Sequence, residues 1–168
     1  MMARARPELA LRPYLPQDAP ALAEIFRASI EELTGEDYSP AQQEAWASTA
    51  DDLDAFAARL GKHLTLIATM QGSPIGFITL DGSTEIGLFY VHPAIAGNGA
   101  GLMLYDAVEK LSAARGTPHL TVEASDTARD FFAHRGFTAE QRNSISVGDE
   151  WLSNTTMKKT LAGKGPHA

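Results

Sequence analysis

A glycine-rich segment, Gly97-Asn98-Gly99-Ala100-Gly101, joins a short apolar run that ends at Pro93 to a segment with helical apolar spacing that begins at Leu102. The first backbone N–H groups of a helix have no partner within the helix, and the helix dipole is positive at that end. Such an end favours an anion, and glycines let a phosphate approach the backbone without meeting a Cβ. We therefore expect an anion-binding loop here.

Two other phosphate-binding loops do not fit this segment. A P-loop ends in Gly-Lys-Ser/Thr, whereas Gly101 is followed by Leu102 and Met103. The dinucleotide-binding fingerprint has glycines at its first, third and sixth positions, and the glycines at 97, 99 and 101 do not have that spacing. A tight turn without a ligand remains the alternative on these residues alone.

Other chemistries lack the residues that they need. The sequence has no cysteine, which excludes disulfides, thiol nucleophiles and thiolate metal sites. The five histidines form neither an HExxH motif nor an i, i+4 pair, so we expect no metal site. The G-x-S-x-G elbow of serine hydrolases is also missing.

The glycine loop lies on the connection between two strands that should pair in parallel. A strand over 86–91, expected to be buried on both faces, precedes the loop, and a strand over 119–124 follows the helix. Short turns join the strands expected over 64–70, 75–80 and 85–91, so these should pair antiparallel. If the parallel strands diverge at their carboxyl ends, the gap can accept an extended ligand that bonds to strand edges.

Periodicity and capping residues predict the other elements. Asp18 and Asp126 are expected to cap helices, Ser39 and Gln42 to form a capping box, and Gly61 to end a helix. The expected elements are a strand over 9–12, helices over 22–33, 40–46, 53–60 and 127–135, and a hairpin with strands over 138–147 and 150–157.

Composition indicates one globular domain over 1–161, because 168 residues with 44% hydrophobic content can bury a sizeable core. We expect the tail over 162–168 to be disordered. No run approaches about 18 apolar residues and no signal peptide is evident, so we expect a cytoplasmic protein without membrane association. The net charge of −7 argues against a nucleic-acid partner and favours a cationic ligand.

The residues around the loop follow the pattern V-x-P and then x-x-G-x-G: Val91, Pro93, Asn98, Gly99, Gly101 and Leu102. This pattern resembles motif A of the GCN5-related N-acetyltransferase (GNAT) superfamily, whose loop holds the pyrophosphate of acetyl-CoA. Ala128, Gly136 and Phe137 resemble the superfamily's next helix motif. The segments YSPAQQEAW at 38–46, TVEAS at 121–125, FFAHRGF at 131–137 and GDEWLSNTTMK at 148–158 are similar to a subgroup of small bacterial N-acetyltransferases.

The resemblance departs from the family pattern at three positions. Ala96 stands where Gln or Arg is usual, Ser125 where Asn is frequent, and Phe132 where a tyrosine often serves as general acid. These departures leave open how the CoA thiolate would depart from acetyl-CoA. Ser125 could orient a water, the thiolate could leave unprotonated, and Tyr105 is expected on the outer side of its helix.

The resemblance implies a three-layer α+β fold. Its mixed, mostly antiparallel sheet would have about seven strands with a central parallel pair, flanked by four or five helices. It also implies direct transfer of acetyl from acetyl-CoA to a primary amine of a small molecule or peptide N-terminus, through a ternary complex. The implied cofactor-binding residues are Phe89, Tyr90, Val91, Gly97, Asn98, Gly99, Ala100, Gly101, Leu102, Ser125, Ala128, Phe131 and Phe132.

Glu85 is the first candidate for the general base, acting through a water, because family members often place a glutamate on this strand. A solvated residue beside a turn is the other interpretation of Glu85. His92 and Glu123 are second candidates, and His92 could instead cap the turn at Pro93. The backbone N–H of Val91 would polarise the thioester carbonyl. The expected substrate pocket combines Glu85 with aromatic residues: Tyr38, Trp46 and Trp151.

A protein without turnover is the alternative function. An acyl-CoA-binding sensor or accessory domain could keep the fold, and the departures at Ala96 and Phe132 favour it. Family members also often form homodimers through the last strands. The acceptor amine and the acyl chain preference do not follow from the sequence.

Overall fold

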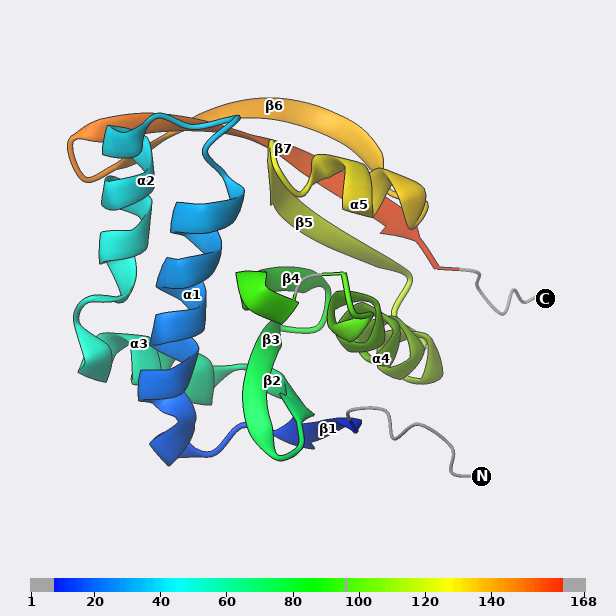
Figure 1. Ribbon diagram of the computed structural model, residues 1–168. Helices are drawn as coiled ribbons and strands as arrows, with labels where there is room; N and C mark the ends of the chain where they lie inside the picture. The colour runs from blue at the N-terminus through cyan, green and yellow to red at the C-terminus, as the bar shows by residue number, and fades with distance from the viewer. Residues whose placement is uncertain (1–7, 96, 162–168) are drawn as a thin grey trace, which may run out of the picture.

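The computed structural model describes residues 8–95 and 97–161, and the predicted departure at Ala96 and the tail over 162–168 lie outside them. A seven-stranded sheet with strand order β1-β2-β3-β4-β5-β7-β6 forms the middle layer. Helices α1, α2 and α3 lie on one side of it and α4 and α5 on the other (Figure 1). The expected three-layer fold is therefore confirmed. No helix of the described residues is long and apolar enough to cross a membrane.

The strands agree closely with the predicted ranges. They are β1 (Leu9–Pro13), β2 (Leu64–Met70), β3 (Ser73–Asp81), β4 (Glu85–Val91), β5 (His119–Ser125), β6 (Thr138–Val147) and β7 (Glu150–Thr160). The α-helices are α1 (Ala19–Leu33), α2 (Pro40–Ala47), α3 (Leu53–Lys62), α4 (Ala100–Ala114) and α5 (Arg129–His134). Short 3-10 turns occupy Pro16–Asp18, Ser48–Ala50 and Pro93–Ile95.

The pairing of the strands follows the predicted topology. β2, β3 and β4 pair antiparallel, as their short turns require. β4 and β5 pair in parallel, but only Glu85 with Thr121 and Ile86 with Val122 are in register. Beyond these two pairs the strands separate, which meets the condition for a gap that can accept an extended ligand. Phe89 to Val91 are consequently half-buried, and the prediction of a strand buried on both faces is wrong for its second half.

Four helix ends were predicted; the capping box is confirmed, and α1 begins directly after Asp18 as predicted, although the Asp18 side chain does not cap it. Ser39 Oγ accepts from the Gln42 backbone N–H at 3.1 Å, and Gln42 Oε1 accepts from the Ser39 N–H at 2.8 Å, which completes the capping box. Asp18 instead accepts from the Leu15 N–H and pairs with Arg12. Gly61 lies inside α3, which continues to Lys62.

Asp126 is the fourth predicted cap and does not cap α5, since its carboxylate binds Arg142 on β6. The Ala128 N–H donates to Ser125 Oγ at 3.1 Å instead. The position of Tyr105 was also predicted wrongly. Its side chain is 1% exposed and packs edge-on against Phe132 and Phe137, because the sheet-facing stripe of α4 includes it.

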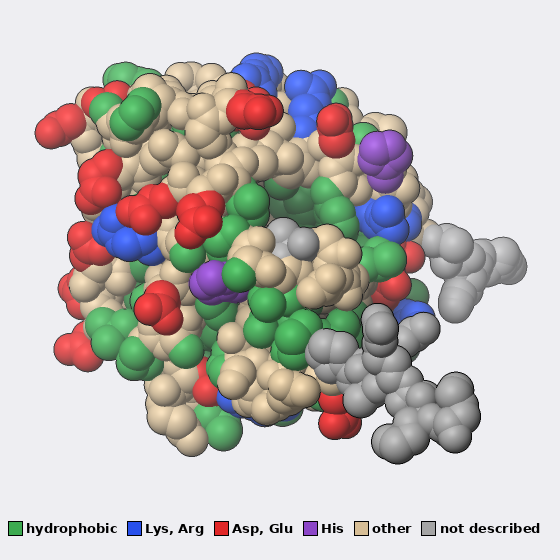
Figure 2. Space-filling view, in the orientation of Figure 1, with side chains coloured by type: hydrophobic (Ala, Val, Ile, Leu, Met, Phe, Trp, Pro, Cys, Tyr) green, Lys and Arg blue, Asp and Glu red, His purple; other side chains and the backbone are tan. Residues whose placement is uncertain are grey.

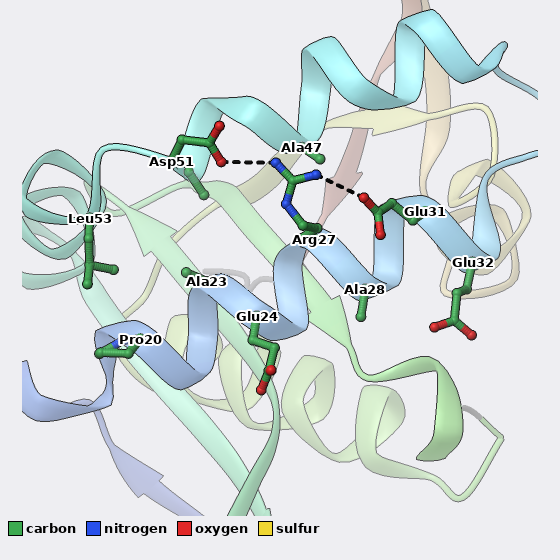
Figure 3. A pocket seen from close by; sticks show the side chains of 11 residues that line it. Pro20, Ala23, Glu24, Arg27, Ala28, Glu31, Glu32, Ala47, Asp51 and Leu53 are labelled. Atoms are coloured by element: carbon green, nitrogen blue, oxygen red, sulfur yellow. Dashed lines mark hydrogen bonds and ion pairs between the residues drawn. The ribbon is translucent and has the colours of Figure 1, made fainter.

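A separate hollow of about 500 Å³ lies between α1 and the segment from α2 to α3 (Figure 3). Arg27 crosses it and pairs with three carboxylates, those of Glu31, Glu44 and Asp51. These ion pairs raise the pKa of Arg27 further above its ordinary value. No residue of β4 or β5 lines this hollow, so Arg27 joins neighbouring helices away from the separated strands.

Candidate active site

The separated ends of β4 and β5 enclose three adjoining hollows, which share Trp46, Tyr90 and Ser125 in their linings. One of about 250 Å³ lies between β4, the end of α1 and α5, and its lining includes Val91 and Phe131. Another of about 120 Å³ lies toward β6 and β7. In the space-filling view, hydrophobic side chains line the depression between α1 and α5 (Figure 2). We call these three hollows together the β4–β5 opening.

The backbone of β4 presents hydrogen-bonding groups to this opening. The His92 N–H donates to the Ile75 carbonyl at 2.8 Å, so the next pair, Val91 with Gly76, is a non-hydrogen-bonded pair of the antiparallel ladder. The N–H and C=O groups of Val91 therefore point away from β3, toward the β5 side, where pairing has ended. This orientation supports the role predicted for the Val91 N–H.

The glycine loop lies at the same end of β4. Gly97 and Gly99 have positive φ angles of 93° and 88°, which a glycine adopts without strain. The first intrahelical bond of α4 runs from the Met103 N–H to the Gly99 carbonyl, so the N–H groups from 100 to 102 precede it. A Cβ on Gly101 would lie 3.6 Å from a Val91 methyl group, which shows how closely α4 begins beside β4.

The structure brings most of the predicted site residues together. Those that line the β4–β5 opening are Tyr38, Trp46, Phe89, Tyr90, Val91, Gly101, Ser125, Ala128, Phe131 and Phe132. Gly99 and Leu102 line a different hollow, on the outer side of α4, and Ala100 is 1% exposed. Asn98 donates its backbone N–H to the Ile95 carbonyl within the loop.

Two predicted residues have other surroundings. Trp151 is 64% exposed and does not line the opening, because alternation along β7 turns its neighbour Leu152 inward. The prediction of Trp151 in the substrate pocket is therefore wrong. His92 accepts the Ala94 N–H at Nδ1 (3.1 Å), which is the capping role that the sequence left open.

Glu85 lies at the closed end of the opening, one residue before the lining residues Ile86 and Gly87. It is half-buried, and its pKa is raised above the ordinary value by burial and then by the charges of Asp81 and Glu123. Arg59 and His63 partly offset this increase. The raised pKa fits a group that exchanges protons, although a structural ion network can raise a pKa as well.

Glu123 lines the opening and has a fixed orientation. Its Oε1 accepts from Asn143 Nδ2 at 2.9 Å and from Thr156 Oγ1 at 2.8 Å. Asn143 also donates to Asn154 Oδ1, and Asn154 lines the same hollow. This network could not be predicted, because its members come from three strands and carry no motif.

Tyr90 faces the opening from β4, and its hydroxyl accepts from Trp46 Nε1 at 3.3 Å. Burial raises the pKa of Tyr90 to about 12, so the phenol stays protonated at neutral pH. It can therefore donate a hydrogen bond into the opening. Sequence reasoning placed Tyr90 only beside the cofactor, because it did not show which face of β4 the phenol occupies.

Tyr38 joins the loop after α1 to the far half of the sheet. Its hydroxyl donates to the Ser153 carbonyl at 2.7 Å and accepts from the Asp126 N–H at 2.9 Å. The side chain is 5% exposed and packs edge-on against Trp46. Tyr38 therefore packs as a core residue and also lines the hollow toward β7.

Replacing Tyr38 with phenylalanine should lower the free energy of unfolding by about 1–3 kcal/mol, because two buried backbone groups lose their partner. Urea denaturation of the two proteins measures this difference. Tyr14→Phe is the control, since the Tyr14 hydroxyl is 3.5 Å from the Ala57 carbonyl and makes at best a weak bond. Equal losses in the two variants would show that the Tyr38 bonds contribute nothing special.

Comparisons with known proteins agree with this geometry. The family model described as an acetyltransferase (GNAT) domain matches residues 34–161. The uncharacterized N-acetyltransferase YafP of Escherichia coli K12 is 28% identical over 148 residues, which cover 88% of this chain and 93% of that protein.

Solved structures show the same fold. The crystal structure of a GCN5-related N-acetyltransferase from Rhodopseudomonas palustris is 58% identical, with a TM-score of 0.89, and covers 96% of this chain and 99% of that chain. The PaiA N-acetyltransferase from Thermoplasma acidophilum, in complex with coenzyme A, is 20% identical with a TM-score of 0.76, covering 91% and 99%. Because the family model matches residues 34–161 and the fold agrees throughout, the chain belongs to the GNAT family of N-acetyltransferases, which are acyltransferases.

Proposed function

We propose that this chain transfers an acetyl group from acetyl-CoA directly to a primary amine of a small molecule or a peptide N-terminus. The observation that carries the proposal is the β4–β5 opening, where the free N–H of Val91 and the glycine loop lie at the same strand end. An extended pantetheine chain fits such an opening, and its pyrophosphate fits the N–H groups at the start of α4. The PaiA N-acetyltransferase, which has a similar fold and was solved in complex with coenzyme A, supports this assignment.

The residues present fit this cofactor. Val91 would hold the acetyl carbonyl through its backbone N–H, while Phe89 and Phe131, with ring centroids 5.5 Å apart, would cover the thiol end. Bound acetyl-CoA supplies an acetyl group activated as a thioester. The loop's backbone N–H groups would bind the pyrophosphate.

The amine enters from the side of β6 and β7 in this proposal. Tyr38, Trp46 and Tyr90 form the aromatic wall of that hollow, and Glu123 supplies a carboxylate. An alkyl ammonium ion is attracted by both features, and the overall charge of −7 attracts it at longer range. We therefore favour a cationic primary amine as acceptor.

Glu85 would remove the amine's proton through a water, since an alkyl amine with a pKa of about 10.4 is almost wholly protonated at neutral pH. The neutral nitrogen attacks the carbonyl carbon, and the Val91 N–H stabilises the oxyanion that forms. The carbon–sulfur bond would then break and the attacking nitrogen would lose its second proton to a water, which leaves a neutral amide and the CoA thiolate. Ser125, which lines all three hollows, would orient a water near the departing sulfur.

Thiol release in the presence of acetyl-CoA tests this function. We expect release only when a primary amine is present, with the acetylated amine identified by mass spectrometry. The chain has no cysteine, so a thiol reagent reports CoA without a background from the protein. Tight CoA binding without release across small amines and peptides would instead favour an acyl-CoA-binding module, and absence of CoA binding would refute both functions.

A further inference from the structure

The β4–β5 opening begins at a β-bulge in β4. In the pairing of β3 with β4, Ile78 faces Phe89 and Leu80 faces Ile86, so Thr79 alone stands opposite two residues. These two residues are Gly87 and Leu88. The bulge follows directly after the last parallel pair with β5. A bulge bends its strand and interrupts regular pairing, so its position coincides with the start of the opening.

The bulge also decides which side chains face the two sides of the sheet. Ile86 and Phe89 pack on the side of α4 and α5, whereas Leu88 and Tyr90 pack on the side of α1. Regular alternation from Ile86 would have placed Phe89 on the side of α1. The bulge therefore turns Tyr90 to the amine side and Phe89 toward α5.

A side chain holds this bulge. The Leu88 N–H donates to Thr79 Oγ1 at 2.8 Å, and that hydroxyl donates to Asp81 Oδ1, also at 2.8 Å. Thr79 is fully buried, at 0% exposure, so its hydroxyl has both bonds within the protein. Asp81 directs the hydroxyl, because a carboxylate only accepts and leaves the Thr79 lone pairs for Leu88.

The Asp81 carboxylate also packs directly against the bulge. A Cβ on Gly87 would overlap both carboxylate oxygens of Asp81, so any other residue here would have to displace this group. Arg59 Nη2 and His63 Nδ1 approach the same carboxylate at 4.0 and 3.9 Å. The Asp81 carboxylate therefore lies between the Thr79 hydroxyl, the end of α3 and the glycine of the bulge.

We propose that Thr79 and Asp81 are positioning residues that hold the β4 bulge, and with it the opening that admits CoA. Without the hydroxyl, the Leu88 N–H loses its partner within the bulge, which favours regular pairing that continues from Leu80 with Ile86 and so places Ile78 opposite Leu88. That shift of one residue reverses the faces of Phe89 and Tyr90 and removes the bend that separates β4 from β5. The link to CoA rests on the proposed function, whereas the link to the bulge does not.

Thr79→Val tests the proposal, because valine keeps the shape and removes only the hydroxyl. We expect hydrogen exchange of the Leu88 amide to become about tenfold faster and the Kd for CoA to rise about tenfold, the ratio expected for one buried hydrogen bond. Thr79→Ser keeps the hydroxyl and should restore both values nearly to those of the wild type. If serine is as impaired as valine, packing of the methyl group is responsible and the proposal is wrong.

Thr65→Val is the matched control. Thr65 is also buried on a strand, and its Oγ1 donates to the Leu60 carbonyl at 2.8 Å, away from the bulge. The Thr65→Val variant should have a lower free energy of unfolding. Its affinity for CoA should be unchanged, and so should the protection of the Leu88 amide from hydrogen exchange relative to global unfolding. If both threonine variants behave alike, Thr79 has only a general structural role.

Asp81→Ala serves if Thr79→Val does not fold. It removes the acceptor of the Thr79 hydroxyl at a half-buried position, and we expect the same two changes. Unchanged Leu88 exchange and CoA affinity in this variant would overturn the proposal. If wild-type protein does not bind CoA, the proposed function fails, and Leu88 exchange alone decides whether Thr79 and Asp81 hold the bulge.

Discussion

Gly99→Asp should weaken CoA binding at least about 100-fold, because a like charge placed beside a bound phosphate costs several kcal/mol. Gly99 is the residue that precedes α4, and its φ is +88°. Aspartate tolerates this left-handed conformation better than most residues, and no atom lies within 4 Å of the added Cβ. The variant should therefore fold, and isothermal titration calorimetry with CoA measures the loss.

Gly99→Asn separates the charge from the shape. Asparagine adopts the same backbone conformation and occupies nearly the same volume, so we expect it to retain much of the affinity. The circular dichroism spectra of both variants should match that of the wild type. Equal affinity in the aspartate variant and the wild type would show that CoA phosphates do not lie at this loop.

The glycine loop could be predicted because its information is local. A strand end at Pro93, closely spaced glycines and a helical pattern from Leu102 specify strand, loop and helix within a short segment. The path from β4 through α4 to β5 then fixes the parallel pair by handedness alone. The capping box at Ser39 was predictable for the same reason, since it needs only the residues of one turn.

Contacts between distant segments could not be predicted in this way. Asp18 directly precedes α1 and Asp126 lies in the turn before α5, but each binds an arginine on another element, and an ion pair with a guanidinium competes well for a carboxylate. The contact between Asp81 and Gly87 depends on a bulge, whose local sign in the sequence is the isolated Gly87, but a glycine alone does not identify the carboxylate that packs against it. The backbone parts of the site and its candidate carboxylates, Glu85 and Glu123, could therefore be predicted from the sequence, while the partners of Glu123 required the structure.

Glu85→Gln should lower kcat/KM about 100-fold or more for amine acetylation at neutral pH, which is the typical contribution of a general base. Glutamine keeps the size of the side chain but cannot accept the proton. In the wild type the rate should fall with decreasing pH below a midpoint that lies above the ordinary glutamate pKa, because burial and the nearby Asp81 and Glu123 raise the pKa of Glu85. This limb should be absent in the variant.

Glu140→Gln is the control for the loss of a negative charge, since Glu140 is exposed on β6 and does not line the opening. Its rate and pH profile should match those of the wild type. If the Glu85→Gln variant kept the wild-type pH dependence of the rate, Glu85 would be structural, and Glu123 or solvent would take the proton. Glu123→Gln would then show the loss instead.

The same substitution should change stability in the opposite direction. The folded protein holds a proton on Glu85 at pH values where the unfolded chain has lost it, so stability attributable to Glu85 falls as pH rises from the ordinary pKa through the raised one. Glu85→Gln removes this penalty, and its Tm should exceed the wild-type value at neutral pH. The difference should shrink below about pH 4, where the carboxyl group is protonated in both states. If Glu85 were kept for packing, its replacement would lower Tm, so a lower Tm at neutral pH would contradict this account. A carboxylate retained for chemistry at the expense of stability predicts a variant that is more stable and slower.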